Sequence, residues 1–217
     1  MGLRINQNIE ATNSYRNLSV TQSQLSKSME KLSSGFRINR AADDAAGLAI
    51  SEGLRSQVGG LKVAVRNAQD GVSVAQTAEG ALTEVHSMLQ RMNDLSVQYN
   101  NGTQNTESQA ALQAEFDALN TEITRIADNT KFNGVDLFAG AALTFQVGYD
   151  NLDTIDISAT ALADFTAGAA MTAVAITDSN TLQAAITEVS TQRAELGAVQ
   201  NRFEHTINNV NVAIENL

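Results

Sequence analysis

Apolar residues recur at steps of three and four positions along four long stretches of the chain. This spacing is typical of helices that bury one face. The four stretches are residues 5–36, 43–99, 106–129 and 182–217. The second runs for 57 residues from Asp43 to Tyr99, which corresponds to roughly 85 Å of unbroken helix. The pattern therefore predicts a rod rather than a globular core.

The first stretch carries a narrow apolar seam, which is the face that a helix presents to other helices. Gln22 fills one slot of the seam, and Ser33-Ser34-Gly35 follows it. Because glycine tolerates the left-handed conformation that ends many helices, we expect this helix to end there. The apolar members of the seam are Tyr15, Leu18, Leu25, Met29, Leu32 and Phe36.

Residues that can cap a helix precede two of the other stretches. Asp43 or Asp44 is expected to cap the second helix, and Thr106 or Ser108 the third. Glycines also interrupt the second stretch, and each weakens a helix by up to about 1 kcal/mol relative to alanine. We expect close backbone packing at these positions, which are Gly47, Gly53, Gly59, Gly60, Gly71 and Gly80.

Polar residues interrupt the apolar stripe of the last stretch, at Arg193 and Gln200. Two interpretations remain open. Either these residues lie at the edge of a helical bundle, or they fix the register of a contact with another chain.

The period changes to two over residues 143–158, where apolar residues alternate with Thr144, Gln146 and Asp156. This alternation predicts a β-hairpin. Asn133-Gly134 predicts a tight turn just before it. Residues 159–179 are small and weakly patterned, which indicates a loop or a short strand. The expected fold is mainly α: a long antiparallel helical rod or bundle with a small β-hairpin region.

Composition agrees with long helices. Hydrophobic residues make up 43% of the chain and charged residues 18%, as in folded proteins. The chain has no proline, which would break a helix, and no cysteine, which excludes disulfides and thiolate chemistry. Residues 1–40 carry six basic and two acidic side chains, whereas residues 101–180 carry two and eleven. The acidic remainder would repel phosphate, so we expect no nucleic-acid binding.

The sequence contains no motif for catalysis or for a cofactor. His86 and His205 lie outside any metal-ligand spacing, and neither a nucleophile elbow nor a phosphate-binding loop occurs. Asp43-Asp44 is better explained by helix capping than by acid–base chemistry. Asn17 and Asn101 match the N-glycosylation pattern, which is frequent by chance. We therefore expect neither an enzyme nor a cofactor.

No stretch approaches the roughly 20 apolar residues of a membrane span, so we expect no membrane insertion. The first residues also lack the apolar segment of a secretory signal peptide. Long helices with apolar seams favour either a self-assembling structural subunit or a coiled-coil binding module.

Several ordered motifs, spread over nearly the whole chain, resemble those of bacterial flagellins. The run at 32–47 is similar to the N-terminal signature of this family, and the motifs at 193–202 and 215–217 are similar to its C-terminal helix. The motifs are LSSGFRINRAADDAAG at 32–47, RNAQDG at 66–71, AQTAEGAL at 75–82, FNG at 132–134, RAELGAVQNR at 193–202 and ENL at 215–217.

The resemblance implies a domain organisation. Residues 1–42 would form the N-terminal helix of the inner tube of a filament, with the seam residues Leu18, Leu25, Met29, Leu32 and Phe36 in its contacts. Residues 43–139 and 180–217 would form a helical rod domain, and residues 140–179 its β-hairpin and loop region. The variable outer domains of larger flagellins are expected to be absent. The family continues past the ENL motif into a terminal helix that pairs with the first, and this sequence ends before that helix.

The resemblance also implies partners and a location. The chain would form a homopolymer with other flagellin subunits, outside the cell, in the flagellar filament. It would contact flagellar junction and cap proteins, and would leave the cell through the flagellar type III export apparatus without a cleaved signal peptide. The alternative within the same group of proteins is the hook–filament junction protein, which has a similar helical core.

Flagellins of this kind are ligands of the host Toll-like receptor that senses flagellin. By motif match, Arg91, Leu95 and Glu115 would occupy the receptor-contact positions. The same surface also packs neighbouring subunits in a filament, so filament contact is the alternative role of these residues.

Overall fold

The computed structural model describes residues 8–166 and 175–217. The chain divides into two compact units, Met1–Ser56 and Gln57–Leu217, and the boundary falls inside the second helix. The mainly α fold with a small β region is confirmed. In chain order the described elements are α1 (Ile9–Ser34), α2 (Ala45–Tyr99), α3 (Thr106–Asn129), β1 (Lys131–Phe132), β2 (Val135–Asp136), β3 (Leu143–Gln146), β4 (Thr154–Ile157) and α4 (Ser179–Asn216).

The helix ends follow capping chemistry. Gly35 adopts the left-handed conformation (φ 72°) after α1 and donates its N–H to the carbonyl of Lys31, as the sequence predicts. Asp44 starts α2, because its Oδ1 accepts the Gly47 N–H at 2.8 Å. The predicted cap of α3 is wrong. Asn105, one residue before the expected position, accepts the Ser108 N–H at 2.7 Å.

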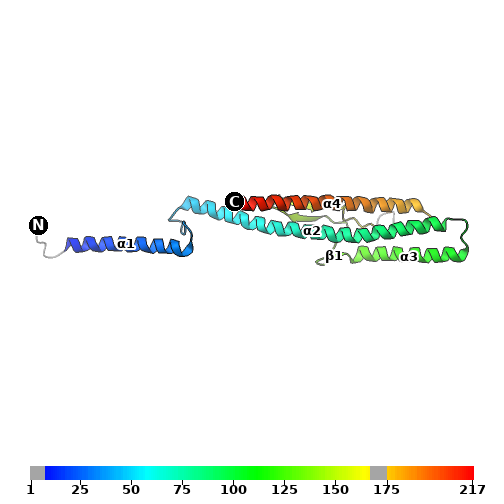
Figure 1. Ribbon diagram of the computed structural model, residues 1–217, viewed down its shortest axis with the longest axis horizontal. Helices are drawn as coiled ribbons and strands as arrows, with labels where there is room; N and C mark the ends of the chain where they lie inside the picture. Colours follow the sequence, from blue (N-terminus) through cyan, green and yellow to red (C-terminus); the bar gives the residue numbers. More distant parts are fainter. Residues whose placement is uncertain (1–7, 167–174) are drawn as a thin grey trace. The chain divides into compact units, whose positions relative to one another are not determined.

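In the second unit, three helices lie side by side (Figure 1). α2 is a single helix of 55 residues, which confirms the unbroken rod element that the sequence predicts. Within this unit α3 and α4 both run antiparallel to α2 (Figure 1). Residues 100–105 return the chain from α2 into α3, whereas both hairpins lie between α3 and α4 in the chain. The Arg193 side chain of α4 approaches Glu79 of α2 at 3.8 Å and joins the two helices across this surface.

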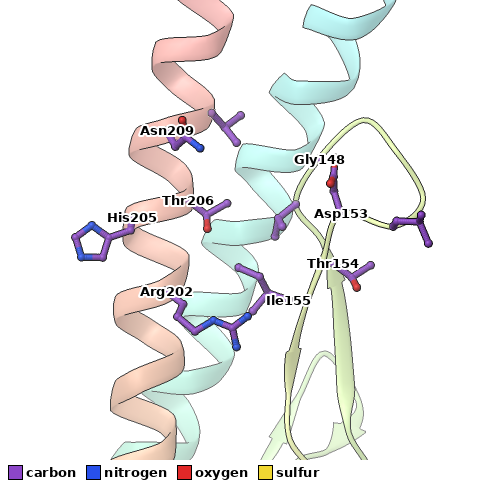
Figure 2. A pocket seen from close by; sticks show the side chains of 11 residues that line it. Gly148, Asp153, Thr154, Ile155, Arg202, His205, Thr206 and Asn209 are labelled. Atoms are coloured by element: carbon purple, nitrogen blue, oxygen red, sulfur yellow. The ribbon is translucent and has the colours of Figure 1, made fainter.

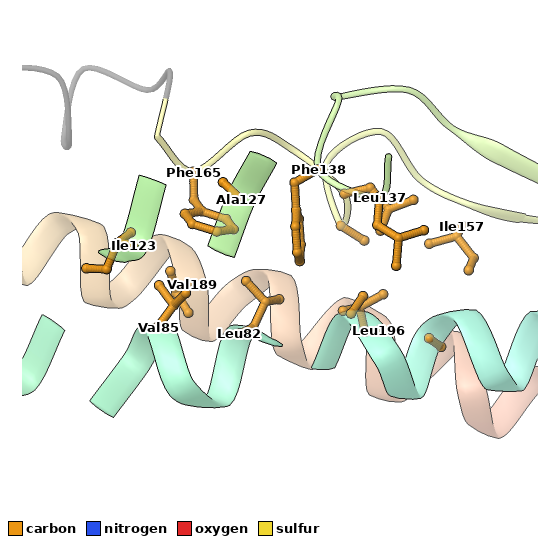
Figure 3. Packing of buried hydrophobic residues seen from close by; sticks show 14 of the residues in the cluster. Leu82, Val85, Ile123, Ala127, Leu137, Phe138, Ile157, Phe165, Val189 and Leu196 are labelled. Atoms are coloured by element: carbon orange, nitrogen blue, oxygen red, sulfur yellow. The ribbon is translucent and has the colours of Figure 1, made fainter. Parts of the chain in front are cut away.

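One apolar core fills the space between these helices and the segments that cover them. Leu82 and Val85 of α2 face Val189 of α4 and Ile123 of α3, and the loop residues Leu137, Phe138 and Phe165 close the core (Figure 3). These side chains are all less than 5% exposed. The phenyl rings of Phe138 and Phe165 meet edge to face, with centroids 4.9 Å apart.

Two antiparallel hairpins cover the helices. β3 and β4 form the hairpin predicted over 143–158, with Phe145 opposite Ile155. Ile155 and Ile157 are buried whereas Thr154 and Asp156 are exposed, which is the alternation of a sheet with one face on the core. β1 and β2 join at Asn133-Gly134, where φ is 48° and 81°. This pair of positive φ values suits a two-residue hairpin turn. The expected loop over 159–179 is confirmed for 159–166 and 175–178, and the remainder lies outside the described residues.

The glycines of α2 differ in how closely other residues pack against them. A Cβ on Gly60 would lie 3.2 Å from Tyr149 Cβ and 3.6 Å from Tyr149 Cα, so close backbone packing is confirmed there. A Cβ on Gly71 would lie 2.5 Å from the Phe203 ring, so at this point a side chain, and not a second backbone, packs on the glycine. The prediction is wrong for Gly53, Gly59 and Gly80, where a Cβ would meet nothing within 4 Å. At Gly47 a Cβ would meet the capping carboxylate of Asp44 instead.

Among the described residues of α4, the polar side chain that is buried in the core is Gln192. Gln192 is 2% exposed, and its side chain donates to the Ala163 carbonyl at 3.4 Å. The Arg193 side chain is one-third exposed and lies at the edge of the bundle. The first of the two interpretations of Arg193 therefore holds within this unit.

Candidate assembly and contact surfaces

Helix α1 exposes its whole apolar seam. None of its residues is buried. The long side chains of the seam keep more than half of their surface in water, and Leu32 is 79% exposed. Most of the stability of a helix in a protein comes from packing of its apolar face, so the seam needs a partner. The exposed members are Tyr15, Leu18, Leu25, Met29, Leu32 and Phe36.

The residues that flank this seam are small and uncharged. If Tyr15 is placed at the first position of a heptad, the two flanking positions of each heptad hold only serine or threonine within α1. The charged residues of the helix lie elsewhere on its surface. Another helix could therefore approach closely along the whole seam. The flanking residues are Thr12, Ser14, Ser19, Thr21, Ser26, Ser28 and Ser33.

The segment after α1 folds back on the end of that helix and forms a charged elbow, residues 35–44. Arg40 Nε lies 2.8 Å from Glu30 Oε1, and Lys31 Nζ lies 3.6 Å from Asp43 Oδ1. The second Asp43 oxygen accepts the backbone N–H groups of Asn39 and Arg40, each at 3.3 Å. Polar contacts therefore hold the elbow, in contrast to the apolar core of the second unit.

These contacts shift the titration of two groups. The backbone N–H of Asn39 is the largest cause that lowers the pKa of Asp43, and Arg40 N–H and Lys31 add to it. The Glu30 carboxylate raises the pKa of Arg40 through a hydrogen bond and through charge. Sequence reasoning treated Asp43 as a capping residue and missed the elbow. The sequence did contain a signal, because Glu30 and Lys31 are followed by residues of opposite charge, Arg40 and Asp43.

Arg91 and Glu115 form an exposed ion pair between α2 and α3. Glu115 Oε1 accepts a hydrogen bond from Arg91 Nε at 2.8 Å, and Arg91 Nη2 lies 2.7 Å from the same oxygen in the ion pair. About half of the Arg91 side chain and 44% of the Glu115 side chain remain exposed. The structure therefore brings together two of the three predicted receptor-contact residues.

Leu95, the third, requires a correction. It is 0% exposed and belongs to the core of the second unit, so its side chain cannot reach a partner in this fold. The apolar period of α2 already runs through Leu89, Met92 and Leu95, which are all buried. Leu95 therefore supports the helix surface that carries Arg91 and does not form part of it.

A shallow hollow lies between α4 and the loop that joins β3 to β4 (Figure 2). Arg202, His205 and Asn209 line it from α4, and Asp153 and Thr154 line it from the hairpin. Among the described residues, no hydrogen bond joins His205 to a hydroxyl or a carboxylate, so this hollow contains no preassembled nucleophile and base. Its chemistry is that of a polar surface.

The described residues contain neither a cluster of metal ligands nor a membrane-spanning helix. No three His, Asp or Glu side chains over 8–166 and 175–217 gather closely enough to hold a metal ion. None of the described helices combines the length and the apolar character that crossing a membrane requires. His86 makes a contact of 3.0 Å with Gln90 on the same helix.

Comparison with known proteins explains the arrangement of these surfaces. The model of the bacterial flagellin N-terminal helical region matches residues 5–142, and that of the C-terminal helical region matches residues 180–217. The chain belongs to the bacterial flagellin family. Members of this family are structural proteins that form the extracellular filament of the flagellum.

Individual flagellins match over most of their length. The flagellin of Halalkalibacterium halodurans is 49% identical, with 98% of this chain and 82% of that protein covered. The flagellin of Bacillus subtilis is 45% identical, with 99% and 84% covered. A crystal structure of Bacillus cereus flagellin is 27% identical and has a TM-score of 0.51 over 70% of this chain and 89% of that chain. The comparison with flagellin sequences and the comparison with a flagellin crystal structure therefore lead to the same family.

Proposed function

We propose that copies of this flagellin polymerise through the seam of α1, and that residues 1–42 form part of the inner tube of the filament. The observation that carries this proposal is that every apolar member of the seam is exposed, on a helix with no buried residue. Residues 43–139 and 180–217 then form the rod domain around the tube, and residues 140–179 its hairpin and loop region. Burial of each seam leucine at a subunit contact is worth about 1.5–3 kcal/mol.

Seeded polymerisation tests this proposal. Purified chain is mixed with short filament fragments, and the growth of filaments is measured by electron microscopy. Leu25→Ser should slow growth by about tenfold to a hundredfold, because each 1.4 kcal/mol of lost burial is a factor of ten. Leu152→Ser is the matched control, since Leu152 is 88% exposed but lies in the hairpin loop of the second unit.

Two outcomes would contradict the proposal. Equal growth of the Leu25→Ser and wild-type chains would show that the seam makes no subunit contact. Absence of growth by a wild-type chain that is helical in solution would show that these residues do not suffice for polymerisation. An unchanged helix content of both variants by circular dichroism excludes unfolding as the cause.

The same proposal includes the flagellar partners. The chain would leave the cell through the type III export apparatus without a cleaved signal peptide, and would assemble between junction and cap proteins. The alternative is the hook–filament junction protein. Complementation separates the two: expression in a strain that lacks flagellin should restore swimming, whereas expression in a strain that lacks its junction protein should not.

A second proposed function is recognition by the host Toll-like receptor that senses flagellin. The observation that favours it is the exposed Arg91–Glu115 pair, which presents a guanidinium and a carboxylate on adjacent helices. The Nε hydrogen bond and the ion-pair contact of Nη2 hold Arg91 toward Glu115, so a receptor would meet a preformed polar surface.

Receptor signalling by the monomer tests this role. Arg91→Ala should reduce signalling in cells that express the receptor, whereas Arg125→Ala should not. Arg125 is a suitable control because it is also an exposed arginine, paired with Glu122 within α3. Exposed ion pairs contribute only about 0–1 kcal/mol to stability, so both variants should remain folded. Unchanged signalling by Arg91→Ala would refute the assignment.

A further inference from the structure

The chain contains two Asn-Gly dipeptides in contrasting surroundings. Asn101-Gly102 lies in the loop between α2 and α3, and Asn133-Gly134 forms the turn between β1 and β2. All four residues are exposed. The same two residue types therefore occur in two backbone conformations, and the reactivity of the two asparagines can be compared within one chain.

At Asn101 the side chain is folded back along its own backbone. The backbone N–H of Thr103 donates a hydrogen bond to Asn101 Oδ1 at 3.3 Å. On either side of it, the Asn101 N–H donates to the Gln98 carbonyl at 3.2 Å, and the Gln104 N–H donates to the Asn101 carbonyl at 3.1 Å. The side-chain amide is thus held beside the peptide that joins Asn101 to Gly102.

We propose that Asn101 is a site of spontaneous deamidation, and that the fold makes it react faster than Asn133. The backbone nitrogen of Gly102 attacks Cγ of Asn101, and a new C–N bond closes a five-membered imide. The Gly102 nitrogen loses its proton, and the side-chain nitrogen leaves as ammonia. Water then opens the imide at either carbonyl and gives aspartate or isoaspartate. The reaction needs no oxidant, reductant or cofactor.

Two features of the loop favour this step. The Thr103 N–H polarises the Cγ carbonyl and stabilises the negative charge that develops on Oδ1 during the attack, as donors of an oxyanion hole do. Gly102 has no Cβ to obstruct the attack, and a Cβ built there meets nothing within 4 Å. Space and polarisation are therefore both present at Asn101.

The hairpin turn restrains Asn133. Its φ of 48° and the 81° of Gly134 belong to a two-residue turn, and the strands on either side pair Phe132 with Val135 and Lys131 with Asp136. Lys131 Nζ also binds Asp136 Oδ1 at 2.8 Å across the base of the hairpin. Rotation of the Asn133 backbone toward the attack geometry would disturb both pairs, so the folded state should protect this residue.

The product changes the surface of the molecule. Each reaction adds a negative charge to the loop, and isoaspartate also lengthens its backbone by one carbon. Because the reaction does not reverse, the fraction converted at position 101 would increase with the age of the folded chain. This inference does not depend on the proposed polymerisation or receptor contact.

Mass spectrometry of tryptic peptides tests the proposal on the whole chain. Trypsin separates the two dipeptides, because cleavage at Arg125 and Lys131 lies between them. After incubation at mildly alkaline pH, conversion at Asn101 should exceed that at Asn133 by about fivefold, the ratio that one net hydrogen bond supports. In concentrated urea the two rates should become similar. Equal native rates, faster conversion of Asn133, or no conversion of Asn101 would overturn the proposal.

Two variants test whether free access to the Gly102 nitrogen and the Thr103 N–H donor cause the fast reaction of Asn101. Gly102→Ala should slow conversion of Asn101 by crowding the attacking nitrogen, and the open space around Gly102 allows the chain to fold. Thr103→Pro removes the N–H donor but retains the dipeptide, so the native rate should fall to near the rate in urea. Conversion of Asn133 is the internal control in both. An unchanged rate in both variants would refute the mechanism.

Discussion

The ring of Phe203 lies directly against the backbone of Gly71, so that a Cβ on this glycine would be 2.5 Å from Cζ. The contact joins α4 to α2 within the second unit. Phe203 is 0% exposed, and its ring also meets Phe145 of β3 edge to face at 5.4 Å. One glycine thus provides the space for an aromatic side chain that connects two helices and the hairpin.

Gly71→Ala should therefore destabilise the chain by about 1–3 kcal/mol, which is the usual cost of inserting a methyl group into a packed core. The matched control is Gly80→Ala on the same helix, where a Cβ meets nothing within 4 Å. That change should stabilise the chain by up to about 1 kcal/mol through helix propensity. Urea unfolding followed by circular dichroism measures both. Propensity alone would stabilise both variants, so equal stability of Gly71→Ala and Gly80→Ala would contradict a packing cost at the Phe203 contact.

Substitution of a core leucine and substitution of a seam leucine should differ sharply in their effect on the unfolding free energy of the unassembled chain. Leu89 is 1% exposed, so Leu89→Ala should cost about 2–5 kcal/mol of unfolding free energy. Leu32 is 79% exposed, so Leu32→Ala should leave the unfolding of the second unit unchanged. Thermal unfolding of the two variants compares them. A large destabilisation by Leu32→Ala would indicate that α1 is packed in solution.

The cap of α3 offers a test at single-residue resolution. Asn105→Ala removes the acceptor of the Ser108 N–H and should cost about 1 kcal/mol. Thr106→Ala, one residue later, should have a smaller effect because Thr106 is already inside the helix. Amide hydrogen exchange in the first turn of α3 would report the difference. Equal effects would contradict the assignment of Asn105 as the cap.

The charged elbow should open in acid. The pKa of Asp43 is lowered, so its carboxylate stabilises the elbow fully above its ordinary pKa of about 3.9 and loses this effect as the pH falls through the lower pKa. Glu30, Lys31 and Arg40 face the same cluster. The amide resonances of Asn39 and Arg40 should therefore shift in NMR spectra below about pH 4. In Asp43→Asn this titration should disappear, and its persistence would show that Asp43 is not the group that titrates.

Periodicity predicted the helices and the larger hairpin because burial itself creates the pattern. The positions Leu82, Val85, Leu89 and Met92 all lie in the apolar rhythm and are all 1% exposed or less. The same rhythm contained Leu95, and its burial follows from the sequence without any structure. The family motif pointed instead to a contact role for Leu95, since a motif identifies a position but gives no information on the direction of its side chain.

Features that depend on a distant neighbour could not be predicted. Gly71 lies on the buried stripe of α2 and Gly80 on its exposed side, but the side chain that fills the space beside Gly71 is Phe203, which comes from α4. Likewise, Gln192 and Arg193 differ by one step of about 100° around the helix. A small shift in the phase of α4 against α2 decided which of the two entered the core. The elbow depended on a chain reversal that no period describes.

The uncharged flanks of the α1 seam have a consequence for the conditions in which a filament can exist. Charged residues beside a seam make helix association sensitive to ionic strength, because dissolved salt screens their attraction or repulsion. The serines and threonines beside this seam carry no charge, and the burial of apolar surface does not weaken as salt is added. A contact made through α1 would therefore hold equally well in dilute and in concentrated saline surroundings.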